Sequence, residues 1–311
     1  MSSSLAAGGD LLGLLSRCDF PPPGNLVTCA VSGGPDSVGL LALVLRAGCE
    51  AVVVHVDHGL RPGSAADGEV VGEVVAKLAA MGGRVELRIV KVEVGPGPNL
   101  EARARSARLA ALPSGACTGH TMDDQVETVL IRLIRGASLD GLAAMRRGPR
   151  HPILGLRRSE MRLVCRELDL PTVTDPSNSD TRFVRNRVRH ELIPLLCDIA
   201  GRDVVPVIAR QAGIMAEESG FLEGLAEDVD PTDVHVLTSS DPVLARRAVR
   251  RWLRQGEEGY PPDYSGVERV LAVAGGFAGA TDVAPGVHVR RSRGKLYKGA
   301  AGGAGGRCAP G

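Results

Sequence analysis

The sequence predicts an α/β fold in which a doubly wound parallel sheet precedes a smaller, mostly helical domain. Through residue 135, short apolar runs with β-branched residues alternate with helix-forming segments. Continuous apolar strands that alternate with helices are typical of a parallel sheet covered on both faces. From about residue 202 the chain continues as helix and becomes acidic, which indicates a second domain.

Four strands are expected, at residues 26–31, 51–56, 84–92 and 115–118. Helices are expected between the first strand and Gly48, and at residues 65–81, 100–112 and 122–135. Right-handed crossovers would bring the carboxyl ends of the strands to one edge, where such sheets bind their ligands. The predicted organisation is an N-terminal helix in residues 1–25, a main domain at 26–200, a second domain at 201–298 that ends in a small hairpin, and a disordered tail at 299–311.

The turn after the first strand reads SGGPDS at residues 32–37. Adjacent glycines let the backbone approach a ligand, and the following helix directs its free N–H groups into the turn. The turn therefore favours a phosphate group. Because it lacks the lysine of a Walker A loop, we expect it to hold pyrophosphate through backbone and hydroxyl groups, with Asp36 recruiting Mg²⁺. An ordinary glycine-containing turn between a strand and a helix is the alternative interpretation.

Polar residues also follow the second and fourth expected strands. Asp57 and His58 end the second strand, where an open α/β sheet contacts an adenosine moiety; a polar exit into a loop is the alternative. The fourth strand leads into GHTMDDQVET at residues 119–128. Thr121 and Asp124 have the spacing of a helix capping box, but capping does not account for the other polar residues of this string. Paired acids beside a phosphate turn suit Mg²⁺ or a substrate ammonium group.

Arginine is concentrated in several helical segments. On the helix expected at 100–112, Glu101, Arg105 and Arg108 share a face, a pattern typical of a solvated face with ion pairs. A helix from about Thr181 would carry a stripe of arginines opposite an apolar stripe, with Pro194 kinking its last turns. The segment 244–254 also has an arginine-rich outer face. The stripe of the helix from Thr181 is expected to face an anion, and the segment 244–254 predicts either a solvated surface or a nucleic-acid surface.

Composition excludes several classes of protein. The 311 residues carry a formal net charge of +1 and are 44% hydrophobic, which is sufficient for a substantial core. The seven cysteines form no CxxC pair, which argues against a zinc ribbon, an iron-sulfur cluster or a disulfide framework. The sequence shows neither a membrane-spanning run nor a secretory signal, so a cytoplasmic location is expected.

Six strings in the sequence carry a family resemblance. SGGPDS (32–37) is similar to the corresponding loop of the PP-loop ATP pyrophosphatases, which cleave ATP to AMP and pyrophosphate. The strings that follow, in order, resemble the tRNA(Ile)-lysidine synthetase family: HVDHGLR (55–61), NLEARARSAR (99–108), GHTMDDQVET (119–128), LIRGASLDGLAAM (133–145) and DPSNSDTRFVRNRVR (175–189). The resemblance extends over about residues 26–196 and is weaker through 200–255.

The resemblance implies a PP-loop fold of the adenine nucleotide alpha hydrolase-like kind and an ATP-dependent ligase. Such enzymes join free lysine to C2 of the wobble cytidine of the isoleucine tRNA with a CAU anticodon, which changes its codon from AUG to AUA. The cytidine O2 attacks the α-phosphate of ATP and releases pyrophosphate, and lysine then displaces AMP from the adenylated tRNA. The implied partners are therefore ATP, Mg²⁺, free lysine and this tRNA. The oligomeric state is left open between a monomer and a homodimer.

The resemblance also implies roles for individual residues. Asp36 is the Mg²⁺-associated residue, Arg105 stabilises charge on the phosphoryl oxygens, and Asp124 is the third catalytic residue. The implied ATP site comprises Ser32, Gly33, Gly34, Pro35, Asp36, Ser37, Asp57 and His58, and the implied lysine site comprises His120, Asp123 and Asp124. The implied tRNA-binding residues are Arg182, Arg185, Arg189, Arg246 and Arg250.

The sequence departs from the family pattern at Leu109, where tyrosine is common, and at His151, where a basic residue is expected. It is also expected to be a short form without the additional C-terminal domain of longer members. Another PP-loop chemistry, such as tRNA thiolation or amidation of a small acid, is an alternative, although the relevant thiolases use paired cysteines. A module that binds ATP without turnover is a second alternative. A dinucleotide-binding Rossmann protein is a third, which the missing GxGxxG order disfavours.

Overall fold

The structure is a computed structural model that describes residues 8–57, 59, 64–92, 103, 107, 110–174, 180–255, 263–284 and 286–300. The chain divides into two compact units, Met1–Ala216 and Glu217–Gly311. The division lies inside one continuous helix, α10 (Val205–Glu227), and therefore beyond the boundary expected near residue 200. The change to acidic residues that suggested the earlier boundary takes place along this helix and does not mark its start.

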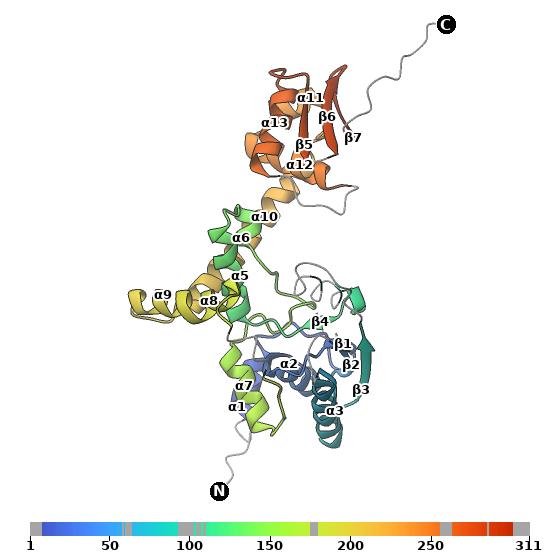
Figure 1. The fold of residues 1–311 in the computed structure, drawn as a ribbon, viewed down its shortest axis with the longest axis vertical. Helices are drawn as coiled ribbons and strands as arrows, with labels where there is room; N and C mark the ends of the chain where they lie inside the picture. The colour runs from blue at the N-terminus through green and yellow to red at the C-terminus, as the bar shows by residue number, and fades with distance from the viewer. Residues whose placement is uncertain are drawn as a thin grey trace, which may run out of the picture. The chain divides into compact units, whose positions relative to one another are not determined.

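The first unit is built on the expected parallel sheet (Figure 1). Its strands are β1 (Leu26–Ala30), β2 (Glu50–Asp57), β3 (Val85–Lys91) and β4 (Cys117–Thr118), arranged in the order β3-β2-β1-β4 with every neighbouring pair parallel. In the registers between strands, Ala30 pairs with both Val54 and Thr118. The carboxyl ends of β1, β2 and β4 therefore meet at one edge, and the prediction of an α/β parallel sheet is confirmed.

Helices α2 (Pro35–Arg46), α3 (Ser64–Ala80) and α7 (Arg158–Glu167) cover this sheet. An uninterrupted run of α2, from Ser37 to Val44, is buried, as expected for a helix that is apolar on all sides. The N-terminal helix α1 (Gly8–Leu15) joins the same core through the buried side chain of Leu14, so residues 1–25 do not stand apart from the main domain. Most of the helix expected at 100–112 lies outside the described residues.

A second group of helices in the first unit carries the charged side chains discussed below. It comprises α5 (Met122–Ile134), the short α6 (Leu139–Leu142) and α8 (Val184–Arg187), a π-helical turn η2 (Val188–Leu192) and α9 (Ile193–Ala200). Val126 and Leu130 of α5, Val188 of the π-turn and Val205 of α10 form an apolar core, against which residues of α9 also pack. The π-turn immediately precedes Pro194, which has no N–H to donate and crowds the preceding turn of an α-helix. The irregularity expected near Pro194 therefore takes the form of a widened turn at Val188–Leu192.

The second unit combines helices with an antiparallel sheet. Helices α11 (Val234–Ser239), α12 (Pro242–Arg254) and α13 (Tyr264–Ala274) share a core with strands β5 (Ala280–Ala284), β6 (Val287–Ser292) and β7 (Lys295–Ala300). The expected hairpin corresponds to β6 and β7, and β5 extends it to three strands. Gly299, assigned to the tail from the sequence, lies in β7 and pairs with His288. Among the described residues of either unit, no helix is both long and apolar enough to cross a membrane.

Gly119 permits the closest backbone approach at the functional edge of the sheet. A Cβ atom built on Gly119 would lie 2.8 Å from the carbonyl carbon and oxygen of Asp36 and 2.9 Å from the Cα of Ser37. These are backbone atoms, which cannot rotate away as a side chain would. The missing side chain therefore lets the segment after β4 lie directly against the start of α2.

This approach predicts that Gly119→Ala destabilises the first unit by about 1–3 kcal/mol through overpacking against backbone. Gly213→Ala is the matched control, because a Cβ at this position of α10 would meet nothing within 4 Å. Replacing an exposed helical glycine is expected to be neutral or to stabilise by up to about 1 kcal/mol. Urea unfolding followed by circular dichroism measures both changes, and equal midpoints for the two variants would contradict the proposed contact.

Candidate active site

The site begins at the glycine turn, residues 32–37, between β1 and α2. The N–H of Ser32 donates to Ser37 Oγ at 3.2 Å, and this hydroxyl donates in turn to the carbonyl oxygen of Gly34 at 2.9 Å. Gly33 has a φ of +88°, which favours glycine, and its carbonyl oxygen accepts the N–H of Val173 at 2.9 Å. Gly34 is the N-cap of α2, and no side chain caps this helix. The turn is thus held open at a helix N-terminus, an arrangement suited to phosphate.

A cavity of about 760 Å³ lies at this edge of the sheet. Its size is within the range of small-molecule and cofactor sites. The walls come from the glycine turn, the ends of β2 and β4, the start of α5, helix α7 and the π-turn. The polar residues that these elements contribute to the walls include Ser32, Asp36, Ser37, Asp57, His120, Asp124, Arg158 and Arg189.

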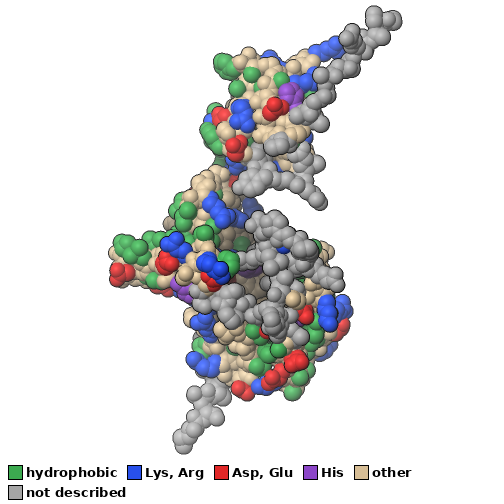
Figure 2. All heavy atoms as spheres, viewed as in Figure 1, with side chains coloured by type: hydrophobic (Ala, Val, Ile, Leu, Met, Phe, Trp, Pro, Cys, Tyr) green, Lys and Arg blue, Asp and Glu red, His purple; other side chains and the backbone are tan. Residues whose placement is uncertain are grey.

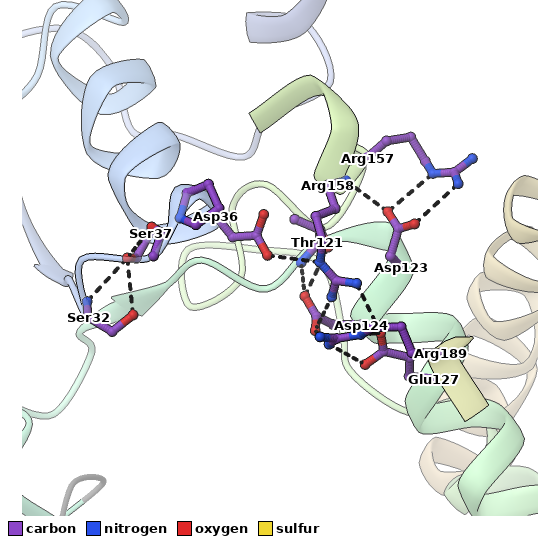
Figure 3. Close-up of polar contacts among 12 residues, drawn as sticks. Ser32, Asp36, Ser37, Thr121, Asp123, Asp124, Glu127, Arg157, Arg158 and Arg189 are labelled. Atoms are coloured by element: carbon purple, nitrogen blue, oxygen red, sulfur yellow. Dashed lines mark hydrogen bonds and ion pairs between the residues drawn. The ribbon is translucent and has the colours of Figure 1, made fainter. Parts of the chain in front are cut away.

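Arg158, the first residue of α7, connects three carboxylates (Figure 3). Its guanidinium donates to Asp36 Oδ2 at 3.1 Å, to Asp124 Oδ1 at 2.9 Å and to Glu127 Oε1 at 3.1 Å. Burial lowers the pKa of this guanidinium, but the three carboxylates outweigh burial and raise it. Arg158 therefore stays charged and ties the start of α2 to α5.

Two further arginines complete what we call the Arg158 cluster: Asp36, Asp124, Glu127, Arg158, Arg185 and Arg189. The Glu127 side chain is completely buried. It accepts from Arg185 Nε at 2.7 Å and from Arg189 at 2.6 and 3.1 Å. With three carboxylates and three guanidinium groups, the cluster is electrically balanced, which is the condition under which buried charges are tolerated.

Asp124 serves both as a helix cap and as part of the site. Its Oδ2 atom accepts the backbone N–H and the hydroxyl of Thr121, both at 2.9 Å. Its Oδ1 atom accepts from Arg158 and from Arg185, at 2.9 and 3.0 Å. Burial raises the pKa of this carboxyl group, but the arginines and the Thr121 N–H outweigh that effect and the net pKa is lowered. The capping interpretation is therefore confirmed, and the same carboxylate also belongs to the Arg158 cluster.

Asp36 is less completely satisfied than the other two carboxylates. Burial raises its pKa to about 6, against the opposing charge of Arg158. Its Oδ1 atom is buried and has no hydrogen-bond partner among the described residues. An unpaired buried carboxylate oxygen beside a phosphate-binding turn fits a Mg²⁺ ligand. No group of three or more acidic, histidine or cysteine residues within the described ranges is arranged to hold a metal ion. A Mg²⁺ ion here would therefore need oxygen atoms from a substrate as well.

The structure separates the residues expected to bind lysine. His120 and Asp124 line the cavity. Asp123 instead accepts from Arg157 Nε and Nη2, both at 3.2 Å, and from the backbone N–H of Arg158 at 2.8 Å (Figure 3). Of the expected ATP-binding residues, Gly33 packs against the side chain of Val173. The residues that line the cavity are Ser32, Gly34, Pro35, Asp36, Ser37 and Asp57. Arg105 and His58 lie outside the described residues.

The arginine stripe expected to face an external anion is divided. Arg185 and Arg189 turn inward to the buried Glu127, whereas Arg182 is 86% exposed and pairs with Asp180. In the second unit, Arg246 pairs with Glu268 and lies over the ring of Tyr264 at 5.7 Å, and Arg250 is half-buried on α12. On the face shown in Figure 2, basic and acidic side chains are interspersed. Helical spacing therefore predicted that Arg185 and Arg189 share a face, but not that this face contacts a buried glutamate.

Sequence reasoning gave no role to Arg158, Glu127 or His55. Arg158 was one of many arginines in a basic stretch, and no local pattern indicates which carboxylates it meets. Glu127 lies in the polar string that capping does not explain, and its i+3 spacing from Asp124 places both residues on one helix face, a signal that could have linked them. His55 is buried, and its Nδ1 lies 2.8 Å from the carbonyl oxygen of Val31, next to the glycine turn.

Comparison with known proteins identifies the family. A family described as PP-loop domain matches residues 16–196, and one described as TilS substrate binding domain matches residues 233–297. A tRNA(Ile)-lysidine synthase of Nocardia farcinica is 38% identical over 259 residues, which span 78% of this chain and 80% of the relative. The chain belongs to the tRNA(Ile)-lysidine synthase family. The synthase of Mycolicibacterium paratuberculosis is 40% identical over 241 residues, 73% of this chain and 74% of that protein.

Solved structures support the fold. The U34-tRNA thiolase NcsA from Methanococcus maripaludis superposes with a TM-score of 0.52 at 14% identity, over 67% of this chain and 78% of that one. At this identity the likeness shows the PP-loop fold alone. It confirms the fold class that the resemblance implied for the sequence.

The Arg158 cluster predicts that Glu127→Gln destabilises the first unit by about 3–5 kcal/mol, because three guanidinium groups lose a buried counter-charge. Glu86→Gln is the matched control: Glu86 pairs with Arg88, and both side chains are largely exposed. We expect the control to leave the free energy of unfolding unchanged, as for most exposed ion pairs. Urea unfolding of both variants provides the comparison, and a loss at Glu127 no larger than at Glu86 would contradict the role assigned to the cluster.

Proposed function

We propose that the chain attaches free lysine to C2 of the wobble cytidine of the CAU-anticodon isoleucine tRNA, using ATP. As a member of the lysidine synthase family, it is a ligase that acts on tRNA and forms a carbon-nitrogen bond. One observation carries the residue-level proposal: the glycine turn and the Arg158 cluster open into the same cavity. A phosphate-binding element thus lies beside charged groups of both signs, as a reaction between ATP and an amino acid requires.

In the first step, the cytidine O2 attacks the α-phosphorus of ATP, and the bond to the β,γ-pyrophosphate breaks. The glycine turn would hold this pyrophosphate through backbone N–H groups and the hydroxyls of Ser32 and Ser37. Asp57, at the end of β2, would face the adenosine portion. The turn would thereby hold the leaving group and leave the α-phosphorus open to the base.

Asp36 would hold Mg²⁺ together with phosphate oxygens of ATP. Bound there, the ion would supply a positive charge against the charge that develops on the phosphoryl oxygens. Asp36 Oδ1 supports the assignment because it is buried without a partner. Arg158 would keep the other oxygen of Asp36 in place, as it does in the structure at 3.1 Å. Arg105 remains our candidate for a second phosphate contact.

The Arg158 cluster suits the zwitterionic head group of lysine. A head group with one ammonium and one carboxylate adds no net charge, so it can exchange ion pairs with a balanced cluster without leaving a buried charge uncompensated. Asp124 would receive the α-ammonium and an arginine of the cluster would receive the α-carboxylate. We favour Asp124 over Asp123 because Asp124 lines the cavity and belongs to the Arg158 cluster, whereas the Asp123 side chain is held by Arg157.

In the second step, the neutral ε-amine of lysine forms a bond to C2 of the cytidine, the bond from C2 to the AMP oxygen breaks, and a proton leaves the amine. Orientation of the amine is the contribution that a fixed head-group site provides. The lowered pKa of Asp124 keeps it ionised, so it is suited to orient an ammonium and not to store the released proton.

For the tRNA, the second unit and the exposed arginines are the proposed contacts. The matched substrate-binding family covers α11, α12, α13, β5, β6 and the first half of β7. Arg182, Arg246 and Arg250 would contact phosphates or splayed-out bases. Arg185 and Arg189 would act on lysine within the Arg158 cluster and not on the tRNA backbone.

The defining experiment incubates the protein with ATP, lysine and the CAU-anticodon tRNA, followed by digestion to nucleosides and mass spectrometry. We expect a lysine-modified cytidine, together with one AMP and one pyrophosphate for each modified tRNA. The same tRNA with its wobble cytidine replaced by uridine is the matched control and should stay unmodified. A sulfur-containing product, or ATP binding with no tRNA-dependent release of pyrophosphate, would replace the proposal with another PP-loop chemistry or with a binding module.

Asp36→Asn is expected to lower the rate of pyrophosphate release by at least about a hundredfold, because the neutral amide is a poor Mg²⁺ ligand. Its Mg²⁺ requirement should also rise, and tRNA binding should stay unchanged. Asp169→Asn is the control, since this carboxylate is 98% exposed and pairs with Lys77. Turnover of the Asp36 variant at the wild-type rate over a Mg²⁺ titration would remove Asp36 from the mechanism.

A further inference from the structure

The hydroxyl of Thr118 lies between two histidines at the end of β4. Thr118 Oγ1 is 2.6 Å from His120 Nδ1 and 2.9 Å from His151 Nδ1. The two imidazole rings are edge to face, with centroids 5.0 Å apart and an interplanar angle of 83°. His120 lines the cavity, whereas His151 belongs to the loop that packs beside β4.

The two distances indicate which atom donates in each contact. In protein structures generally, O–H···O hydrogen bonds are about 2.5–3.0 Å long and N–H···O hydrogen bonds about 2.7–3.2 Å. The 2.6 Å contact is shorter than the N–H···O range, which favours the Thr118 hydroxyl, with its single hydrogen, as the donor to His120 Nδ1. The Thr118 oxygen then accepts at 2.9 Å, so His151 donates its Nδ1–H. A further contact from Thr118 Oγ1 to the Arg150 carbonyl oxygen is longer, at 3.3 Å.

The surrounding backbone fixes this chain of three side chains. The N–H of Thr118 donates to the carbonyl oxygen of Arg150 at 3.0 Å, and the N–H of His151 donates to that of Gly148 at 2.9 Å. Burial and the neighbouring charge of Arg150 lower the pKa of His151, which favours its neutral form. A neutral His151 with its proton on Nδ1 is the species that the donor assignment requires.

We propose that Thr118 and His151 are positioning residues that hold His120 in the tautomer with its proton on Nε2. A nitrogen that accepts a hydrogen bond carries no proton, so His120 has Nδ1 unprotonated and is neutral. Protonation of Nδ1 would place two donors against each other unless the Thr118 hydroxyl turned away. The three-residue chain therefore selects one form of His120 out of three.

This tautomer gives His120 one chemical role in the cavity. Its Nε2–H is a hydrogen-bond donor and not a proton acceptor, so it is suited to an oxygen atom of a substrate and not to deprotonation of the lysine amine. The α-phosphate of ATP and the α-carboxylate of lysine both supply such an oxygen. This consequence rests on the proposed function, whereas the tautomer itself does not.

The tautomer is tested by nuclear magnetic resonance on ¹⁵N-labelled protein without substrates. Two-bond ¹H–¹⁵N spectra distinguish protonated from unprotonated ring nitrogens, and His120→Asn and His151→Asn assign the two rings. We expect the proton on Nε2 in His120 and on Nδ1 in His151. Thr118→Val should release both rings into mixtures of tautomers, and Thr118→Ser should preserve the wild-type pattern. A proton on Nδ1 of His120, or an unchanged pattern in Thr118→Val, would overturn the proposal.

Steady-state kinetics of the same variants test the consequence for substrates. Loss of one aligned hydrogen bond should raise a single KM by about two- to tenfold in Thr118→Val, with rescue in Thr118→Ser. A raised KM for ATP identifies the phosphate as the acceptor, and a raised KM for lysine identifies the carboxylate.

Thr28→Val is the matched control for these measurements. Thr28 lies on β1 of the same sheet, and its hydroxyl makes no hydrogen bond to the residues that the structure describes. Wild-type kinetics in Thr118→Val would overturn the assigned role of the chain. Expected tautomers in a wild-type protein that forms no lysidine would instead count against the proposed function alone.

Discussion

The contact on which the rest of the site depends is the guanidinium of Arg158 among three carboxylates. It joins Asp36, at the start of α2, to Asp124 and Glu127 on α5, and it is itself the first residue of α7. One side chain thus sets the separation between the glycine turn, which ends in Asp36, and the helix that carries Asp124. Such a set of ion pairs stabilises the fold only when every partner is present. If one partner is removed, the opposite charge that it balanced stays buried and uncompensated. The position of the phosphate-binding turn relative to the carboxylates is therefore coupled to the stability of the first unit.

Charge balance within the cluster also explains how one cavity could serve two substrates of different charge. ATP brings several negative charges, and the partly desolvated Asp36 would meet them only together with a cation. In the proposed reaction, lysine would bring a head group of no net charge, which a balanced set of ion pairs can accommodate by exchange. In that proposal the two requirements fall on different carboxylates, Asp36 at the glycine turn and Asp124 on α5. A single acidic patch would not separate them in this way.

The sequence predicted features that depend on local patterns. The parallel strands follow from short apolar runs, and the glycine turn follows from residues that are adjacent in the chain. Arg158 could not be assigned because its partner Asp36 is 122 residues away in the sequence, and no helical or strand period connects them. Arg185 and Arg189 were placed on one face correctly, but a periodicity cannot distinguish a face toward solvent or RNA from a face toward a buried glutamate. The change in composition suggested a boundary near residue 200, but the acidic residues begin part-way along α10 (Val205–Glu227), and the two units divide inside this helix, after Ala216.

Asp123 and Asp124 illustrate how a local rule can decide a functional question. Neighbouring residues on a helix differ in direction by about 100°, so only one of two adjacent acids faces a given site. The capping contact with Thr121 fixes the direction of Asp124, because its Oδ2 must reach the N–H and the hydroxyl of the residue before the helix. With Oδ2 engaged there, Oδ1 faces Arg158 and Arg185, and Asp123 is directed to Arg157. The helix cap, which seemed from the sequence to compete with a functional role, is the physical reason that Asp124 and not Asp123 lies in the site.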